Sequence, residues 1–192
     1  SNGYRTAHHP PTPALLDACD RLGMLVMEEN RHLENSSEIL SQVENMVLRD
    51  RNHPSIFIWS MSNEEPQSGT EEGRKQGQAI YDTIKRLDPT RPVTAAMSWN
   101  DGTWGKGLSK VVDVQGCNYS NNMFDDYHEK HPDHPMIGTE ETGSGTTRGI
   151  YIDDMEKAYK SSYTSTVEHG WPGTAERDFI CLLYTSPSPR DR

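Results

Sequence analysis

The sequence repeats one pattern: a short apolar run, a few polar residues, and then a segment whose apolar residues have helical spacing. The clearest apolar run is SIFIWSMS, residues 55–62, which passes directly into Asn63-Glu64-Glu65. Short runs that are apolar throughout are typical of strands covered on both faces of a sheet. Such strands, separated by helices, indicate parallel β–α units with right-handed crossovers. The sequence therefore predicts an α/β fold.

The helical segments between the apolar runs have recognisable ends. Ser36 stands before apolar residues at helical spacing, which predicts an N-cap and an amphipathic helix up to residue 52. Pro89 and Pro92 end a second, more polar helix. No GxGxxG or GxxxxGK[ST] loop follows any run, so nucleotide binding has no support. On this pattern alone an open, doubly wound sheet fits as well as a barrel.

Composition excludes several classes of protein. The net charge is -10, with 29 Asp and Glu against 19 Lys and Arg, which argues against binding to nucleic acid or to an anionic membrane. No apolar run is long enough to span a bilayer, and no signal peptide is recognisable. The three cysteines have no CxxC pairing, so we expect neither a disulfide scaffold nor a zinc site.

Polar residues stand at the end of every expected strand. One such residue alone is better explained as a helix cap or as a surface group. Six successive strands that end this way favour a functional site, because the carboxyl ends of barrel strands converge on one face. The strand ends are Arg5-Thr6-Ala7-His8-His9, Glu28-Glu29-Asn30, Asn63-Glu64-Glu65, Ser98-Trp99-Asn100, Asn118-Tyr119 and Glu140-Glu141.

Two acidic residues on different strands of one cleft suggest glycoside hydrolysis. One carboxyl group must protonate the leaving oxygen, and the other, ionised, must attack the anomeric carbon. In a retaining enzyme the two groups lie roughly 5–5.5 Å apart. Glu suits this task better than Asp, because its longer side chain reaches from the rim to the sugar.

The segments around these acids resemble the catalytic domain of glycoside hydrolase family 2. NHPSIFIWSMSNEE is similar to the segment that carries the family's acid/base at the fourth barrel strand, and HPMIGTEETGSGTTRGIY to its nucleophile segment at the seventh. YRTAHHPPTPALLDACDRLGMLVMEEN resembles the second and third strands, and RPVTAAMSW and VVDVQGCNYS resemble the fifth and sixth. The resemblance implies an incomplete (β/α)8 TIM barrel, covering strands 2 to 7 and the start of strand 8.

The resemblance also implies roles for individual residues. Glu64 would be the acid/base and Glu140 the nucleophile. Asn63 would bind the sugar 2-hydroxyl, and Tyr119 would hydrogen-bond the nucleophile. The remaining implied residues are Arg5, which would hold Glu140 ionised and oriented, and His8, which would contact the sugar.

Several neighbouring residues have a second interpretation. Glu65 and Glu141 each follow a proposed catalytic Glu and are expected to point away from the cleft, because adjacent strand residues face opposite sides. Trp99 is expected to stack on a sugar face, although packing on its own loop explains it equally well. Some family members bind Mg²⁺ near the acid/base, but His32 stands in ENRHLEN where the family's acidic ligand would fall, which speaks against that metal. The HEKHPDH histidines are interpreted as surface or loop residues rather than as metal ligands.

The family includes β-galactosidases, β-glucuronidases and β-mannosidases. DVQGCNY and TTRGIY are most similar to bacterial β-galactosidases, so a terminal β-galactoside or an oligosaccharide is the expected substrate, hydrolysed with retention. A non-catalytic carbohydrate-binding relative and a metal-dependent hydrolase are the alternatives. The former should have lost an acid, and the latter would need more His and Asp at strand ends than His8 and His9.

The two ends of the chain carry a separate expectation. The family resemblance spans residues 1–180, and CLLYTSPSPRD after it resembles a translated sequencing adapter. We therefore expect residues 181–192 to be non-native and to have no packed role. The first and eighth strands and the domains that precede the barrel are expected to be missing, together with the true N-terminus. A bacterial cytoplasmic or periplasmic location fits, and the sequence does not predict an oligomeric state.

Overall fold

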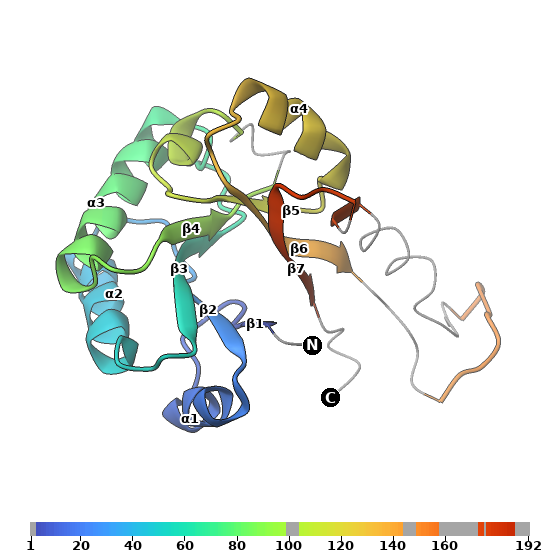
Figure 1. Ribbon diagram of the computed structural model, residues 1–192, viewed down its shortest axis with the longest axis horizontal. Coiled ribbons are helices and arrows are strands. Elements are labelled where there is room, and N and C mark those ends of the chain that lie inside the picture. The colour runs from blue at the N-terminus through green and yellow to red at the C-terminus, as the bar shows by residue number, and fades with distance from the viewer. Residues whose placement is uncertain (1–2, 99–103, 144–148, 158–172, 175, 187–192) are drawn as a thin grey trace.

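The computed structural model describes residues 3–98, 104–143, 149–157, 173–174 and 176–186 of the 192-residue chain, as an incomplete barrel of parallel strands (Figure 1). One sheet has the order β1-β2-β3-β4, and a second has the order β5-β6-β7. Every pairing is parallel, as the β–α pattern predicts. The strands are β1 (Gly3–Arg5), β2 (Leu25–Glu29), β3 (Ile56–Asn63), β4 (Val93–Ala96), β5 (Gln115–Asn118), β6 (Met136–Gly143) and β7 (Ile180–Ser186).

The two sheets continue into each other between β4 and β5. Asn118 N–H donates to Met97 O (3.0 Å), and Ser98 and Asn118 form a parallel bridge. In the part of the chain that the structure describes, β1 pairs with β2 alone and β7 with β6 alone, so the barrel is not closed. The described strands form an open, curved set of parallel strands with helices between them, which confirms the predicted fold class of an incomplete α/β barrel.

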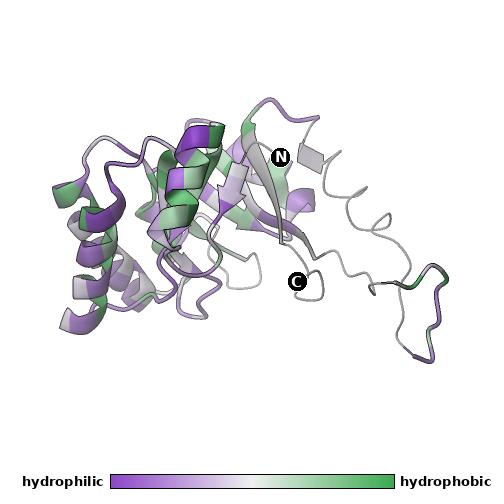
Figure 2. Ribbon diagram, turned by 90° about the horizontal axis from the view of Figure 1, so that it is seen from below, coloured by the Kyte–Doolittle hydropathy of each residue, from purple (hydrophilic) through white to green (hydrophobic). Residues whose placement is uncertain are grey.

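Helices on the outer side of the strands form as their sequence predicts. Helix α2 (Ser37–Asp50) begins after Ser36, whose hydroxyl accepts the Ile39 N–H (3.4 Å). Helix α1 (Pro13–Leu22) ends at Gly23, which has φ of +68° and closes the helix through its N–H to Cys19 O. Figure 2 shows that these helices carry both hydrophobic and hydrophilic residues. The other helices are α3 (Glu71–Leu87), α4 (Phe124–Lys130) and the 3₁₀ turns η2 (Gly107–Lys110) and η3 (Asn121–Met123).

Three clusters of buried apolar side chains hold the strands in place, and one of them packs β5, β6 and β7 against α4. The largest cluster lies between the strands and helices α1 to α3, and includes Leu16, Val43, Trp59 and Ile80. A smaller cluster joins Met27 of β2, Ile58 of β3 and Ile137 of β6. Since β6 is not a neighbour of β2 or β3 in the sheets, these three side chains meet across the inside of the curved sheet. The inner face is thus defined by residues 27, 58 and 137.

The segment after β6 differs in part from the expectation. Ile180–Ser186 forms β7, whose backbone pairs with β6, so residues 181–186 are not an unpaired tail. Whether residues 181–192 are native stays a prediction, because backbone pairing does not test their origin. Helix α4 was not expected from the sequence, and it contains His128, which was interpreted as a surface or loop residue. Within the described residues, no helix is long and apolar enough to cross a bilayer.

Candidate active site

Arg5, the last residue of β1, connects polar residues from four strands. It is 8% exposed, and its guanidinium donates to both oxygens of Glu29, at the end of β2, over 2.8–2.9 Å. Its Nη1 donates to Glu140 Oε2 (2.8 Å) on β6, and its Nη2 donates to Asn63 Oδ1 (2.6 Å) on β3. Two carboxylates and one amide oxygen are therefore oriented by one buried cation.

Glu29 is fully buried at the bottom of the site, beneath the Arg5 guanidinium. Besides Arg5 it accepts the Ser60 hydroxyl (2.8 Å), and His8 Nδ1 lies 3.0 Å from its Oε1. Its position follows from strand geometry, because Glu29 and Ser60 stand two residues after Met27 and Ile58 and so share their inner face. His8, which is partly exposed, is thereby held at the rim of the same site.

Glu140 is held by a phenol as well as by the guanidinium. Tyr119 donates its hydroxyl to Glu140 Oε1, and its backbone N–H donates to Glu140 O (2.8 Å). Burial, then the hydrogen bond and charge of Glu140, raise the pKa of the Tyr119 phenol well above its usual range. The phenol therefore stays protonated and acts as a donor, and both oxygens of Glu140 have a fixed partner.

Glu64 lies beside the same strand end as Tyr119. Its Oε1 accepts from Asn118 Nδ2 (3.0 Å), and its backbone N–H donates to Ala96 O (2.9 Å). Asn118 is oriented in turn by the Thr139 hydroxyl, which donates to its amide oxygen. Asn118 and Tyr119 are consecutive residues, so the carboxylates of Glu64 and Glu140 are held by side chains whose Cα atoms are about 3.8 Å apart.

Local irregularities of the strands aim these residues inward. Strict alternation from Ile137 would bring Thr139 and Glu141 to the inner face of β6. However, the register between β5 and β6 shifts so that Cys117 pairs with Gly138 and Asn118 with Glu140, which turns Glu140 inward. The pairing of β3 with β4 shifts between Ser60 and Asn63.

The backbone is also strained at two of these positions. Glu64 has φ of +49° and Tyr119 has φ of +52°, both in the left-handed region that residues with a side chain rarely adopt. Such conformations cluster at functional sites, where the surroundings enforce them.

The two neighbouring acids lie elsewhere. Glu65 forms an ion pair with Arg31 (2.8 Å), outside the contacts made by Arg5. Glu141 is buried on the other side of β6, near Cys117, and has no hydrogen-bond partner among the described residues. Burial raises the pKa of Glu141 to about 8, so this carboxyl is largely neutral at pH 7.

The structure thus brings together most of the residues singled out from the sequence. Trp99 lies outside the described residues. Two members of the site, Glu29 and Asn118, were noted only as polar strand ends and were not assigned a role. The alternation of side chains along β2, which puts Glu29 on the same face as Met27, could have been read from the sequence. The register shift between β5 and β6 at Asn118 could not, because it depends on how the two strands pair. The predicted residues that share the site are Arg5, His8, Asn63, Glu64, Tyr119 and Glu140.

The segment after β2 does not fit a Mg²⁺ site. Mg²⁺ requires several oxygen ligands in octahedral geometry. Here the Arg31 guanidinium donates hydrogen bonds to the Asn63 carbonyl oxygen (2.7 Å) and to the Glu65 carboxylate (2.8 Å). His32 is exposed. A guanidinium against these oxygens repels a second cation.

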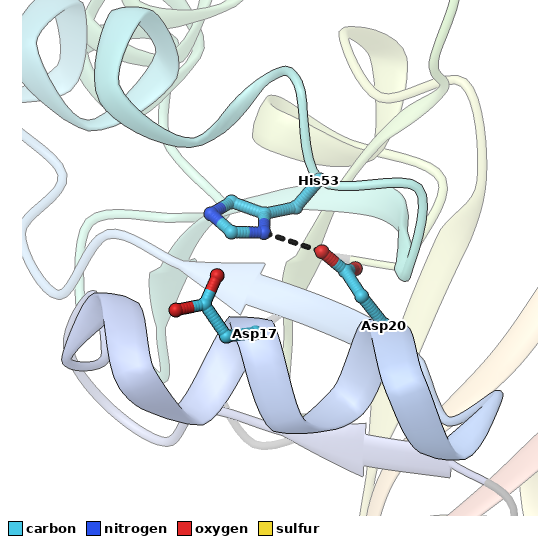
Figure 3. Close-up of side chains that lie close together, drawn as sticks. All are labelled: Asp17, Asp20 and His53. Carbon is cyan, nitrogen blue, oxygen red and sulfur yellow. Dashed lines mark hydrogen bonds and ion pairs between the residues drawn. The ribbon is translucent and has the colours of Figure 1, made fainter.

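One other group of metal-ligand residues lies at the opposite end of the strands. Among the described residues, Asp17, Asp20 and His53 have ligand atoms within 4.8 Å of one another (Figure 3). Asp20, however, accepts the Ser55 N–H (2.9 Å) and contacts His53 Nδ1 (2.6 Å). Although burial opposes it, these hydrogen bonds lower the pKa of Asp20. The group therefore fastens the start of β3 to helix α1.

The HEKHPDH histidines serve packing. His128 stacks on Phe179, with ring centroids 4.0 Å apart, and His131 packs on Tyr127. His134 Nδ1 lies 2.7 Å from the Tyr127 hydroxyl. His131 is exposed, as expected of a surface residue, whereas His128 lies on helix α4 and packs instead of standing in a loop.

Comparison with known proteins identifies relatives along most of the chain. The sequence profile described as glycosyl hydrolases family 2, TIM barrel domain, matches residues 1–37 and 32–162. A β-galactosidase, BoGH2A, from Bacteroides ovatus is 33% identical over 195 aligned positions, which cover 78% of this chain and 23% of that protein. A β-glucuronidase from Sus scrofa is 33% identical over 141 positions, covering 66% of this chain and 21% of that protein.

Solved structures agree. The crystal structure of a glycosyl hydrolase family 2 member from Bacteroides cellulosilyticus superimposes with a TM-score of 0.75 at 30% identity, over 96% of this chain and 23% of that one. The chain thus spans less than a quarter of the length of each of these three relatives.

Proposed function

Since the chain belongs to glycosyl hydrolase family 2, as part of its TIM-barrel domain, we propose that it carries the catalytic centre of a retaining β-glycosidase, with Glu140 as nucleophile and Glu64 as acid/base. The observation that supports this most is the pair of contacts from consecutive residues, Asn118 to Glu64 and Tyr119 to Glu140. Two carboxylates held in this way can face the same anomeric carbon.

The chemistry proceeds in two displacements. An oxygen of Glu140 bonds to the anomeric carbon while the bond from that carbon to the leaving oxygen breaks, and the leaving oxygen takes the proton of Glu64. Glu64 then removes a proton from water, whose oxygen bonds to the anomeric carbon and displaces Glu140. Two inversions give net retention.

The contacts around the two acids suit unequal roles. Arg5 and Tyr119 donate to Glu140, which supports a carboxylate that must be ionised and oriented before attack. Glu64 is less buried, and the group that donates to it is the neutral amide of Asn118 rather than a cation. Asn63 uses its amide oxygen to accept from Arg5, so its nitrogen is the group that can donate to the sugar 2-hydroxyl.

The proposed substrate is a terminal β-galactoside. Its support is the similarity to BoGH2A and the bacterial β-galactosidase character of DVQGCNY and TTRGIY. The similarity to a β-glucuronidase makes a β-glucuronide the second candidate, and a β-mannoside is the third. Initial rates on aryl β-galactoside, β-glucuronide and β-mannoside separate the three, and activity on none of them would favour a carbohydrate-binding relative.

Azide trapping tests the two roles. In the protein that carries this chain, Glu64→Ala with an activated aryl glycoside should accumulate the glycosyl-enzyme, and added azide should release a β-glycosyl azide. Glu140→Ala should form no covalent intermediate, and azide in the vacated space should give the α-azide. Product configuration is read by NMR.

Exposed Glu71 on α3 provides the control, because its carboxylate pairs with Arg74 on the same helix and not with Arg5, Asn118 or Tyr119. An α-azide from the Glu64 variant would exchange the two roles. Activity in both variants equal to that of Glu71→Ala would refute the assignment.

A further inference from the structure

Arg31 ties the segment after β2 to the turn after β3. Its Nη1 donates to Asn63 O over 2.7 Å and to Glu65 Oε1 over 2.8 Å. These two acceptors belong to the residues on either side of Glu64. The guanidinium thus holds the backbone just before the proposed acid/base and the side chain just after it.

Hydrogen bonds from neighbouring residues fix the backbone on both sides of Arg31. Asn30, its neighbour, donates its amide to Met61 O (3.0 Å) on β3 and to His32 O (2.7 Å). Gln67 donates to Leu33 O (3.0 Å) from the opposite direction. The two segments, 30–33 and 61–67, are therefore joined on both sides of Arg31.

The turn that contains Glu64 has an unfavourable backbone conformation and therefore requires stabilising contacts. Glu64 has φ of +49°, a conformation that is unfavourable for a residue with a side chain. Such a conformation persists only where neighbouring contacts enforce it. The contacts on this turn include Glu64 N–H to Ala96 O, Ser68 N–H to Glu65 O, and the two from Arg31, beside the side-chain hydrogen bond from Asn118 to Glu64.

We propose that Arg31 is a positioning residue for Glu64, and that Glu65 acts as its counter-ion. By fixing the Asn63 carbonyl and the Glu65 carboxylate, Arg31 keeps the Glu64 side chain directed at Asn118. Arg31 acts through the backbone and not on the sugar. The kinetic part of this proposal rests on the assignment of Glu64 as acid/base, whereas the geometric part does not.

The Arg31–Glu65 ion pair also gives the Glu65 carboxylate a structural role. Glu65 could have been a surface acid, but its side chain is 18% exposed and it meets a guanidinium that is 34% exposed. A single, partly exposed ion pair of this kind contributes little to the free energy of unfolding. Its effect on the direction of Glu64 can therefore be separated from its effect on folding.

Arg31→Met removes both contacts and keeps most of the side-chain volume. We expect kcat/KM for an alkyl glycoside, whose leaving group needs the proton of Glu64, to fall ~10- to 100-fold. The same ratio for a dinitrophenyl glycoside, whose leaving group needs no proton, should change little. Glu65→Gln should act in the same direction but more weakly, and Arg31→Lys should restore part of the loss.

Arg74→Met is the matched control. Arg74 pairs with Glu71 on α3, and its side chain is 35% exposed, almost the same as that of Arg31. The control should leave both kcat/KM values unchanged, and both variants should unfold at nearly the same temperature. Equal losses on the two substrates in Arg31→Met, or losses as large in Arg74→Met, would overturn the proposal.

A crystal structure of Arg31→Met keeps the test independent of the assigned roles. The proposal predicts that Glu64 leaves the left-handed region or loses its hydrogen bond to Asn118, whatever reaction the protein catalyses. An unchanged Glu64 would refute the positioning role. If the turn moves in the crystal but Glu64→Ala behaves like wild type in the azide experiment, the proposed function fails and the positioning role stands.

Discussion

The two ends of the parallel strands both carry buried carboxylates, but these are satisfied in different ways. At the amino end, Asp88 accepts from the Trp59 indole (3.0 Å), from the N–H and hydroxyl of Thr90, and from Arg91 (2.6 Å). Asp113 accepts the Val93 N–H (2.9 Å) in the same manner. These acids take up backbone and side-chain donors next to the starts of strands.

At the carboxyl end, the acids bind side chains from distant strands and lie next to strained backbone. Glu140 is held by Arg5 of β1 and by Tyr119, and Glu64 by Asn118. The only non-glycine residues with positive φ in the described chain, Glu64 and Tyr119, are both at this end.

The acids at the two ends of the strands also differ in the direction in which their pKa values are shifted. Despite burial, hydrogen bonds lower the pKa values of Asp20, Asp88 and Asp113 at the amino end. Burial raises that of Glu141 at the carboxyl end. The comparison teaches that acids at the amino end accept hydrogen bonds next to strand starts, whereas Glu140 and Glu64 at the carboxyl end accept from side chains of other strands.

The largest expected effect comes from replacing one arginine at each end of the strands and comparing the losses of stability and of kcat/KM. Arg5→Met leaves the buried Glu29 without its main partner, so we expect a loss of about 3–5 kcal/mol in the free energy of unfolding. In the folded fraction, kcat/KM should fall ~10²–10³-fold, because Glu140 loses its cation. Urea unfolding and initial rates measure the two losses.

Arg91→Met is the counterpart at the amino end. Arg91 pairs with the buried Asp88, so stability should fall by about 2–3 kcal/mol while kcat/KM of the folded protein stays the same. A loss of kcat/KM in Arg91→Met as large as that in Arg5→Met would remove the distinction between the ends.

A smaller effect is expected from Asp88→Asn, through its pH dependence. The folded-state pKa of Asp88 is depressed, so its contribution to stability is present above its unfolded pKa of ~3.9 and is lost as pH falls through the folded value. At pH 7 the variant should be about 2 kcal/mol less stable than the parent. This difference should shrink as pH falls below ~3.9, as followed by urea unfolding. A difference that does not vary with pH would mean that the carboxylate charge plays no part.

The smallest effect concerns Glu28, an acid at the carboxyl end that faces α2 instead of the site. Burial, then neighbouring Asp50, raises the pKa of Glu28 to about 9. Because this pKa is raised above the unfolded value of ~4.3, the stability of the neutral form is fully present below ~4.3 and is lost as pH rises towards 9.

Glu28→Gln, which cannot ionise, should remove this loss and be more stable than the parent by roughly 1–2 kcal/mol at pH 8. Glu38→Gln, at an exposed position of α2, is the control. The interpretation is wrong if Glu28→Gln and Glu38→Gln lose stability equally between pH 5 and pH 9.

The sequence was most informative where a short pattern determines a local structure. Ser36 predicted the start of α2, and the apolar runs predicted the strands, because capping and burial act over a few residues. Among the cysteines whose side chains the structure describes, Cys19 and Cys117 are buried thiols.

The sequence was less informative where tertiary contacts decide the structure. Helix α4 was missed because its polar sequence shows little periodicity, and Phe124 and Tyr127 alone anchor it. The inward turn of Glu140 depends on register with β5, which local alternation cannot reveal.

The central claim is that the carboxyl end of this barrel presents Glu140 as the nucleophile. The most direct measurement is to treat the protein that carries this chain with a 2-deoxy-2-fluoro β-glycosyl fluoride, which forms the glycosyl-enzyme but turns it over slowly, and to locate the added mass by peptide mass spectrometry. The account predicts one fluorosugar per chain, bonded to Glu140, and none on the Glu140→Gln variant. A label on Glu64 or Glu141, or on any acid at the amino end, would contradict it.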